Sequence, residues 1–563
     1  MLKIPYGISD YRTLKEEGYY YIDKTMYLEK LENVGKTLVY LRPGRFGKSL
    51  FTSMMYYYYD INSKELFDSL FKDTYVYEHF TKNKNNYYVL KFDFSGMTSF
   101  GKNDEELELE FIRKVSSGIE EFNVHYGVSA NTDYRNITPN GLILEFLDYF
   151  RSLKLENKLY ILIDEYDNFT NSILDGEGDK FKGIVGNGGF LKAFYSEIKE
   201  YSGKGIVDRV FITGICPITL DSMTTGFNTS SNISTNPIFN EMIGLNHKEV
   251  KELIKDIDDD KMEEIFDLML KNYDGYLFSE ESKTLVFNAT LVMYFLNDYY
   301  QYNKIPKNLV DNNIAFNYGK IGNLLKLQNN RYYKEILDTI LKNGTITSEL
   351  KTKFNLEEDF TRDDFISLLY YFGYLTVNGS SIGGKVLFGI PNYVMQELYT
   401  NYFLKLLRDV NINIDDKVMI ESLEEIEYEG KIEKISKYVE DILKLSDNKI
   451  FMKFDEKYIQ LLYFSLLINK KDFIIYNEYP CKNGFIDLML FKNSDFCKYN
   501  IMIELKYLKV DEYKKNKRLL KQKREDAIRQ LIFYSEDERF DKSNLKRYVV
   551  IFVGNDLKLL EEV

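Results

Sequence analysis

Two apolar segments near the C-terminus carry acidic and basic side chains at a spacing suited to phosphodiester cleavage. Asp487 lies in the run 484–491, and Glu504 and Lys506 lie in the next run, 499–506. Because alternate residues of a strand point to the same face, Glu504 and Lys506 share a face that Asp487 on the neighbouring strand can join. Two carboxylates suit Mg²⁺, which holds a scissile phosphate and activates water. Lys506 would orient that water.

Neighbouring segments add to this pattern. Glu456 lies in an amphipathic helix expected over 455–467 and can supply an outer carboxylate. Between residues 506 and 529 the basic side chains outnumber the acidic ones, which predicts salt-dependent contacts with a nucleic-acid backbone. The alternative explanation of the basic segment is a solvated helix face. The alternative explanation of Glu504 and Lys506 is an ordinary ion pair on a strand.

A second group of chemical residues lies in the N-terminal third. The apolar run 37–41 precedes residues 42–49, which read RPGRFGKS, and a stretch of helical length follows. Strand, glycine-containing loop and helix are the context of a phosphate-binding loop, although Arg42 replaces its first glycine. Lys48 would reach the β- and γ-phosphates, and the Ser49 hydroxyl would bind Mg²⁺. The expected nucleotide contacts in the loop are Gly44, Arg45, Gly47, Lys48 and Ser49.

Acidic residues interrupt a second apolar run, 158–169, which is typical of a buried parallel strand. Open α/β sheets bind ligands at the carboxyl ends of their strands. Asp164 is therefore expected to hold Mg²⁺ through water, and Glu165 to polarise the attacking water. A third run places Thr213 where a polar group can sense the γ-phosphate. Arg209 opens this run, and a role in structure or solubility is favoured for it over a phosphate contact.

Length and composition restrict the class of protein. A chain of 563 residues is too long for one core, and 44% hydrophobic with 29% charged residues is ordinary for a globular protein. The sequence shows no leader-like N-terminus and no apolar stretch of membrane-spanning length, so we expect a cytoplasmic protein. Three cysteines and three histidines at no ligand spacing argue against disulfides, zinc and histidine-based cleavage. The net charge of −13 does not by itself indicate a nucleic-acid binder.

The middle of the chain is mostly helical in pattern. Between residues 335 and 398, helices are followed by a hairpin, which suggests a winged-helix module. Such a module can read duplex DNA, but its helix around 351–365 is not strongly basic, and packing against the nucleotide domain is an equal alternative. The predicted domains are 1–245 (nucleotide binding), 246–444 (helical and winged-helix-like) and 445–563 (nuclease-like).

An ordered set of motifs resembles the prokaryotic AAA-ATPase-like proteins that carry a C-terminal PD-(D/E)XK nuclease domain. The resemblance implies that Asp23 and Lys24 matter near the nucleotide and that Gln530 matches the family's glutamine. The family usually has arginine at the position of Gly44 and often a basic residue at that of Phe485. The matching segments are 6–11, 21–25, 42–49, 163–167, 211–214, 273–276 and 524–534.

The predicted fold class is α/β, with an N-terminal P-loop ATPase containing a parallel sheet and a C-terminal restriction-endonuclease-like domain. The predicted function is ATP binding and hydrolysis coupled to a Mg²⁺-dependent endonuclease, with DNA favoured over RNA, a role in defence or mobile-element control, and homo-oligomerisation as an option. One alternative is a nucleotide-dependent switch whose nuclease-like domain does not cleave, and another is an ATPase that acts on protein partners. The predicted catalytic residues are Glu165, Asp487, Glu504, Lys506 and Gln530, and the predicted metal ligands are Ser49, Asp164, Glu456, Asp487 and Glu504.

Overall fold

The computed structural model of the chain separates into two compact units. One comprises Met1–Ile336 and Thr345–Val394, and the other comprises Leu337–Gly344 and Met395–Val563. Phe169 and residues 355–360, which belong to segments predicted above, lie outside the described residues. The three-domain division stays a prediction. The structure describes residues 2–97, 102–168, 189–217, 231–306, 308–310, 333–354, 361–381, 383–446, 454–468, 472–482, 484–494 and 496–563.

A five-stranded sheet forms the centre of the first unit, in the order β2-β3-β4-β1-β5, and all of its strand pairs are parallel. β1 is buried along its whole length, and β3 is buried after its first residue. A strand covered on both faces needs apolar side chains throughout, which explains the continuous apolar runs. The strands are β1 (Thr37–Leu41), β2 (Tyr87–Asp93), β3 (Lys158–Asp164), β4 (Val207–Gly214) and β5 (Ser231–Asn232).

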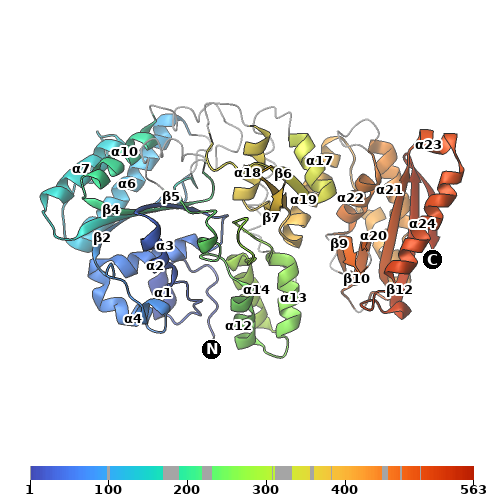
Figure 1. The fold of residues 1–563 in the computed structure, drawn as a ribbon, viewed down its shortest axis with the longest axis horizontal. Helices are drawn as coiled ribbons and strands as arrows, with labels where there is room; N and C mark the ends of the chain where they lie inside the picture. Colours follow the sequence, from blue (N-terminus) through green and yellow to red (C-terminus); the bar gives the residue numbers. More distant parts are fainter. Residues whose placement is uncertain are drawn as a thin grey trace. The chain divides into compact units, whose positions relative to one another are not determined.

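Helices cover both faces of this sheet (Figure 1). The longest, α6, begins with a capping box at Asn103 and ends at Gly127, and it packs on β2 beside α7 and α10. On the opposite face α3 packs on β2 and β3, with α1 against it. The two layers leave the carboxyl ends of the strands as the edge at which loops can gather. The helices are α1 (Tyr11–Glu16), α2 (Tyr27–Val34), α3 (Lys48–Tyr59), α4 (Phe67–Phe71), α5 (Tyr75–Glu78), α6 (Asp104–Tyr126), α7 (Pro139–Ser152) and α10 (Phe190–Gly203), with 3-10 turns η1 (Ile61–Leu66) and η3 (Pro237–Phe239).

The region after the sheet is helical and ends in a small antiparallel sheet of order β6-β8-β7. The second helix of this winged-helix-like segment, α18, is buried from Phe365 to Tyr371. Its neighbours are parts of the same unit, because Tyr370 donates a hydrogen bond to the Phe278 carbonyl (3.2 Å). α18 is therefore held by packing within this unit. The helix expected around 351–365 lies partly outside the described residues, so its reading of DNA stays a prediction. The elements are α12 (His247–Ile257), α13 (Met262–Tyr273), α14 (Ala289–Tyr302), α17 (Tyr333–Asn343), β6 (Thr345–Ser348), α18 (Arg362–Tyr371), β7 (Thr376–Ser381) and β8 (Lys385–Gly389).

Gly275, between α13 and α14, makes the tightest backbone approach of this region. Its φ is +94°, and a Cβ atom there would lie 2.0 Å from the carbonyl oxygen of Pro391. We expect Gly275→Ala to lower the free energy of unfolding by about 3 kcal/mol or more, because backbone strain adds to an unavoidable clash. Thermal melting measures the effect. Gly384→Ala is the control, because Gly384 has a φ of +76° but a Cβ atom there would have nothing within 4 Å. This variant should lower the free energy of unfolding by about 1 kcal/mol. Equal losses in the two variants would contradict the clash.

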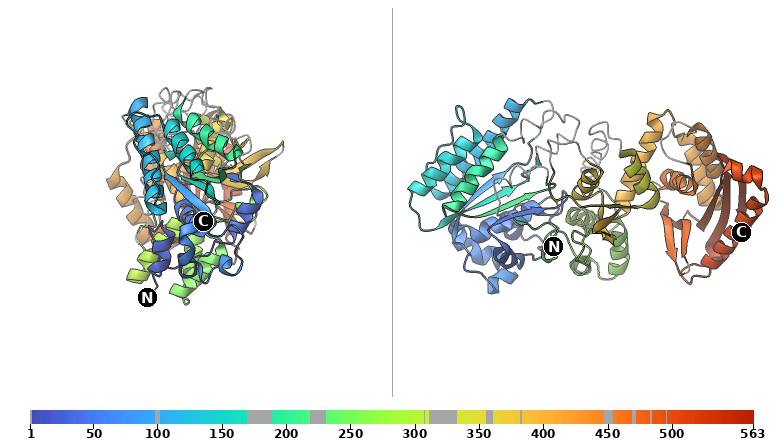
Figure 2. Two further views of the ribbon diagram at one scale, coloured as in Figure 1. Left: turned by 90° about the vertical axis from the view of Figure 1, so that its left-hand side faces the viewer. Right: turned by 45° about the horizontal axis from the view of Figure 1, so that its top comes forward.

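The second unit contains a five-stranded mixed sheet in the order β13-β12-β11-β10-β9. β11 and β12 are parallel, and α24 connects them, while the other neighbours are antiparallel. Figures 1 and 2 show α24 on one face of the sheet and α21 and α22 on the other. The elements are α19 (Tyr393–Asp409), α20 (Asp416–Glu424), a π-helical turn η4 (Glu425–Glu429), α21 (Glu433–Ser446), α22 (Glu456–Leu467), β9 (Phe473–Cys481), β10 (Gly484–Lys492), β11 (Asn500–Leu508), α23 (Val510–Lys515), α24 (Arg518–Tyr534), η5 (Lys542–Asn544), β12 (Leu545–Val553) and β13 (Asp556–Glu562). None of the helices within the described ranges is long and apolar enough to span a membrane.

Candidate functional site

The loop between β1 and α3 has the shape expected of a phosphate-binding loop. Its left-handed backbone falls on Arg45 and Gly47, with φ of 69° and 105°, and not on Gly44. Distant residues hold two of its carbonyl groups. Thr290 donates to the Arg45 carbonyl from its hydroxyl (2.6 Å) and its N–H (3.2 Å), and the Gly244 N–H donates to the Phe46 carbonyl (3.1 Å). The loop is thus held from the region that follows the sheet.

Arg42, which replaces the first glycine of the motif, has a structural role. Its side chain is 1% exposed and donates to the carbonyls of Leu41 (2.8 Å), Ser234 (2.7 Å) and Phe239 (2.9 Å). The guanidinium also lies 4.0 Å from the centre of the Phe278 ring. These contacts direct Arg42 into the core and away from a bound phosphate.

Lys48 and Ser49 open α3 and line a cavity together with Glu165. The Lys48 ammonium donates to the carbonyls of Arg42 (3.0 Å) and Pro43 (2.9 Å). Burial lowers the pKa of Lys48, and the nearby carboxylates of the β3 end oppose that shift. Phosphate oxygens would replace the two carbonyls as acceptors and would favour the charged amine.

The acids at the end of β3 face this loop. Asp164 is 2% exposed and accepts hydrogen bonds from the Thr213 hydroxyl (2.5 Å) and the Glu165 N–H (3.0 Å). Thr213 is fully buried, so it orients Asp164 and does not itself line the cavity. Burial raises the pKa of Glu165 to about 7, against the opposing effect of Lys48. A carboxylate with a pKa near neutrality suits proton transfer from water.

Asp167, which follows β3, and Arg209 of β4 have structural contacts at opposite ends of the sheet. Asp167 accepts hydrogen bonds from the N–H groups of Ile215 (3.0 Å) and Cys216 (2.7 Å) and so ties the end of β3 to that of β4. Arg209 has structural contacts, which agrees with the favoured alternative. Arg209 lies near the amino end of β4 and donates to the Gly35 carbonyl (3.1 Å), before β1 begins. The phosphate loop lies at the other end of these parallel strands.

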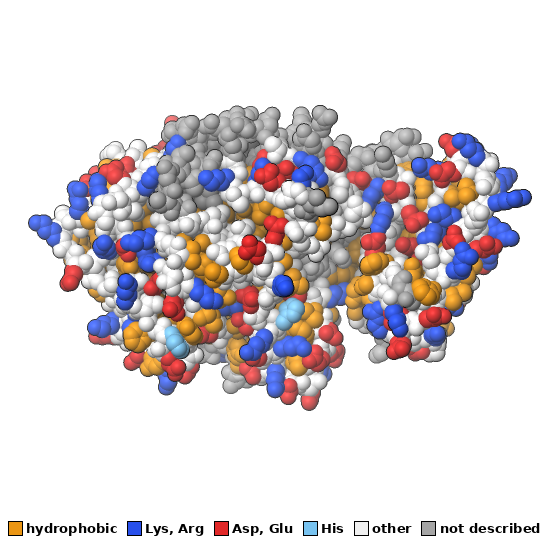
Figure 3. Space-filling view, viewed as in Figure 1, with side chains coloured by type: hydrophobic (Ala, Val, Ile, Leu, Met, Phe, Trp, Pro, Cys, Tyr) orange, Lys and Arg blue, Asp and Glu red, His pale blue; other side chains and the backbone are white. Residues whose placement is uncertain are grey.

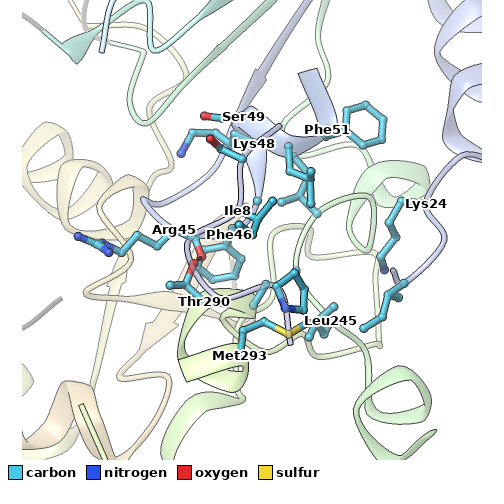
Figure 4. Close-up of a pocket in the computed structure, with 18 of the residues that line it drawn as sticks. Ile8, Lys24, Arg45, Phe46, Lys48, Ser49, Phe51, Leu245, Thr290 and Met293 are labelled. Atoms are coloured by element: carbon cyan, nitrogen blue, oxygen red, sulfur yellow. Dashed lines mark hydrogen bonds between the residues drawn. The ribbon is translucent and has the colours of Figure 1, made fainter. Parts of the chain in front are cut away.

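The cavity beside the loop has a volume of about 320 Å³. Figure 4 shows Lys48 and Ser49 at the top and Lys24 at the right, with Ile8 near the centre and the apolar side chains of Leu245 and Met293 at the bottom. A phosphate loop next to an apolar wall is the arrangement that a nucleotide requires, with its base on the wall and its phosphates on the loop.

Asp23 and Lys24 have mainly structural contacts. The family resemblance places these two residues near the nucleotide. Lys24 lines the cavity but forms an ion pair with Glu249 (2.6 Å). Asp23 accepts hydrogen bonds from the Thr25 N–H (2.8 Å) and the Tyr75 N–H (2.6 Å). The two side chains therefore connect the N-terminal segment to α12 and α5.

The second site lies where β10 and β11 separate. Their pairing ends at Leu488 and Ile503, and beyond that point the Leu505 N–H donates to the Asp487 carboxylate (2.7 Å). The Lys506 ammonium lies 2.6 Å from Glu504, which places both side chains on one face as the strand period predicts. The same ammonium lies 4.0 Å from the carboxylates of Asp487 and Glu456.

The carboxylates of this site are poorly compensated. Burial raises the pKa values of Asp487 and Glu504, and Asp487 raises that of Glu504 further. Glu504 is 2% exposed, and within the described part of the chain its Oε2 atom has no hydrogen-bond partner. Uncompensated oxygens of this kind fit a divalent cation, which commonly uses one or two carboxylates together with water and substrate phosphates.

Glu456 is 38% exposed and accepts a hydrogen bond from the Tyr507 N–H (3.2 Å), so it lies at the rim. Across the described ranges, no three Asp, Glu, His or Cys side chains form a ready-made metal cluster. Asp487 and Glu504 therefore stay the buried candidate metal ligands, and Glu456 lies beside them at the more exposed edge.

Two protein-family models match the parts of the chain that contain these two sites. Residues 5–224 match the family described as "Predicted AAA-ATPase", and residues 454–562 match the PD-(D/E)XK nuclease superfamily. The chain carries an AAA-ATPase-like domain and a PD-(D/E)XK nuclease domain. The nuclease match covers Glu456, Asp487, Glu504, Lys506 and Gln530.

Among solved structures, the chain is similar to the Walker-type ATPase PABY2304 of Pyrococcus abyssi. The identity is 12%, the similarity covers 67% of this chain and 94% of that one, and the TM-score is 0.37. The comparison with curated proteins gave no match.

The nuclease domain contains a buried amide that the sequence interpretation missed. Gln460 of α22 is 2% exposed and donates to the Asp487 carbonyl (2.6 Å), at the point where β10 leaves its ladder with β11. An amide side chain within the mainly apolar segment 458–467 was its only sequence signal. On α24, Gln530 hydrogen bonds with Tyr534 and lines a cavity with Lys506, while its Oε1 atom is buried without a partner among the described residues.

We expect Gln460→Leu to lower the free energy of unfolding by about 1–3 kcal/mol, because the Asp487 carbonyl loses its partner. Nuclease activity should fall as well, since Asp487 is no longer held. Thermal melting and a cleavage time course measure both effects. Ser465→Ala is the matched control on the same helix, because the Ser465 hydroxyl is buried without a partner among the described residues. Equal behaviour of the two variants would contradict the role of Gln460.

Proposed function

We propose that the chain binds and hydrolyses ATP in its N-terminal domain and cleaves nucleic acid with its C-terminal domain in a reaction that depends on Mg²⁺. The observation that carries the nuclease proposal is the convergence of Asp487, Glu504 and Lys506 around a buried carboxylate oxygen that has no partner among the residues that the structure describes. Most buried polar atoms have a hydrogen-bond partner, so this oxygen needs an explanation, and a bound cation between Asp487 and Glu504 would supply one.

In the nuclease domain Asp487 and Glu504 are the proposed metal ligands. A divalent cation there would hold the scissile phosphate and lower the pKa of the attacking water. Lys506 lies within reach of all three carboxylates, so it can orient that water and offset charge on the phosphate. Gln530, which lines the same cavity as Lys506, is a proposed contact to substrate or water.

In the ATPase-like domain the N–H groups of the loop that includes Gly44, Arg45 and Gly47 are proposed to hold the phosphates. Lys48 would contact the β- and γ-phosphates. Ser49 and Asp164 are the proposed Mg²⁺ ligands, and Glu165 would accept a proton from the attacking water.

We further propose DNA over RNA as substrate and a cytoplasmic role in defence or mobile-element control. That role rests on analogy between domain combinations. Assembly of several copies is a further option for a protein of this kind.

The test is incubation of supercoiled plasmid and of RNA with Mg²⁺, with and without ATP. Nicking that requires Mg²⁺ and responds to ATP is the expected result. ATP turnover stimulated by DNA without cleavage would favour the nucleotide-dependent switch. ATP turnover indifferent to nucleic acid, again without cleavage, would point to protein partners.

A further inference from the structure

One face of α24 carries basic residues and an exposed aromatic ring beside the nuclease centre. Lys523, Arg529 and Phe533 line a cavity of about 690 Å³ together with Glu456 and Lys506. Figure 3 shows lysine and arginine side chains over α23 and α24, with acidic side chains among them. The cavity therefore joins the proposed metal site to a surface suited to a polyanion.

The ring of Phe533 lies 6.5 Å from that of Tyr534 but does not belong to the side of α24 that packs on the sheet. Its side chain is 49% exposed, whereas Ala527, Leu531 and Tyr534 form the side of α24 that packs on the sheet. Isolated exposed hydrophobic residues are common on proteins. Phe533 differs because its ring borders the same cavity as Lys506, at the end of a helical face that also carries Lys523.

Arg529 forms an exposed ion pair with Asp526 on this face. An exposed pair of this kind contributes little free energy. A phosphate group can therefore compete for the guanidinium at small cost.

We propose that Phe533 stacks on an unpaired base close to the scissile phosphate while Lys523 and Arg529 contact the backbone of the same strand. The nuclease domain would thus take single-stranded nucleic acid, or a strand with unpaired nucleotides. This inference rests on the proposed nuclease function. An aromatic side chain can stack only on a base that is out of the duplex, because paired bases already stack on their neighbours. Basic side chains contact phosphates whatever the sequence.

The chain has no tryptophan, which allows a direct test of stacking. Phe533→Trp creates a single tryptophan at the proposed contact, which can be excited at wavelengths that tyrosine does not absorb. Its emission is measured in EDTA with single-stranded and duplex oligonucleotides of one sequence. Strong quenching by the single strand, with little by the duplex, is expected. Phe496→Trp is the control, since Phe496 is 68% exposed and follows the other end of β10 from Asp487.

Phe533→Ala should weaken single-strand binding about tenfold, as loss of one base stack predicts, and leave duplex binding unchanged. Melting of both variants checks their fold. Equal quenching by duplex and single strand, or none by either, would overturn the proposal. Because EDTA prevents metal-dependent cleavage, the result is independent of nuclease activity. If the single strand quenches the tryptophan but the protein does not cleave nucleic acid, the stacking proposal stands and the proposed cleavage is contradicted. If the protein cleaves nucleic acid without quenching, the proposed cleavage stands and the stacking proposal is contradicted.

Discussion

Glu504→Gln is expected to reduce nucleic-acid cleavage by about a thousandfold or more while ATP hydrolysis continues. The amide keeps the size of the side chain but removes the negative charge that a cation needs. Metal stabilisation of charge in the transition state is worth several kcal/mol, and each 1.36 kcal/mol is a factor of ten in rate. Plasmid nicking and phosphate release, measured on the same preparation, test both parts of the prediction.

Thermal melting separates lost chemistry from lost structure in this variant. Burial raises the pKa of Glu504, so the folded state disfavours its charge, and the neutral amide should not lower the melting temperature near pH 8. Glu562→Gln on β13 is the matched control, because that side chain is half-exposed and lies on an edge strand. Cleavage by Glu504→Gln at the wild-type rate would exclude Glu504 as a metal ligand.

Lys48→Ala is expected to weaken ATP binding about a hundredfold and to abolish hydrolysis. The ammonium would donate charge-assisted hydrogen bonds to phosphate oxygens, each worth about 1.5–3 kcal/mol. Fluorescence titration with a labelled ATP analogue measures the binding. Lys36→Ala is the control, since Lys36 is 67% exposed and pairs with Asp208 at the opposite end of the sheet.

The same variant tests the coupling between the domains. If ATP regulates cleavage, Lys48→Ala should lose the response of nicking to ATP while Mg²⁺-dependent chemistry stays intact. Normal ATP binding by Lys48→Ala would show that the cavity beside α3 is not the nucleotide site.

The positions of the candidate catalytic side chains were predictable where a local rule of strand geometry fixes them. Glu504 and Lys506 share a face because strand side chains alternate, and the apolar runs around residues 37–41 and 158–164 match β1 and β3. Asp164 follows from its place at the carboxyl end of a buried parallel strand.

The parts that escaped prediction depend on residues far apart in the chain. The role of Arg42 is set by the carbonyls of Ser234 and Phe239, which no local pattern brings near it. Gln460 acts on Asp487 through packing of α22 on the sheet. The burial of α18 likewise results from tertiary contacts, such as the hydrogen bond from Tyr370 to the Phe278 carbonyl.

The hydrogen bonds that Thr290 and Gly244 donate to the phosphate loop bear on how the protein can be divided experimentally. A fragment that stops at residue 245 keeps all five strands of the first sheet but lacks Thr290, the donor to the Arg45 carbonyl. It also lacks Tyr276 and Phe278, whose rings pack against Phe46. We expect such a truncation to fold around its sheet and yet to bind nucleotide poorly. The smallest fragment that retains an intact loop must extend beyond the start of α14.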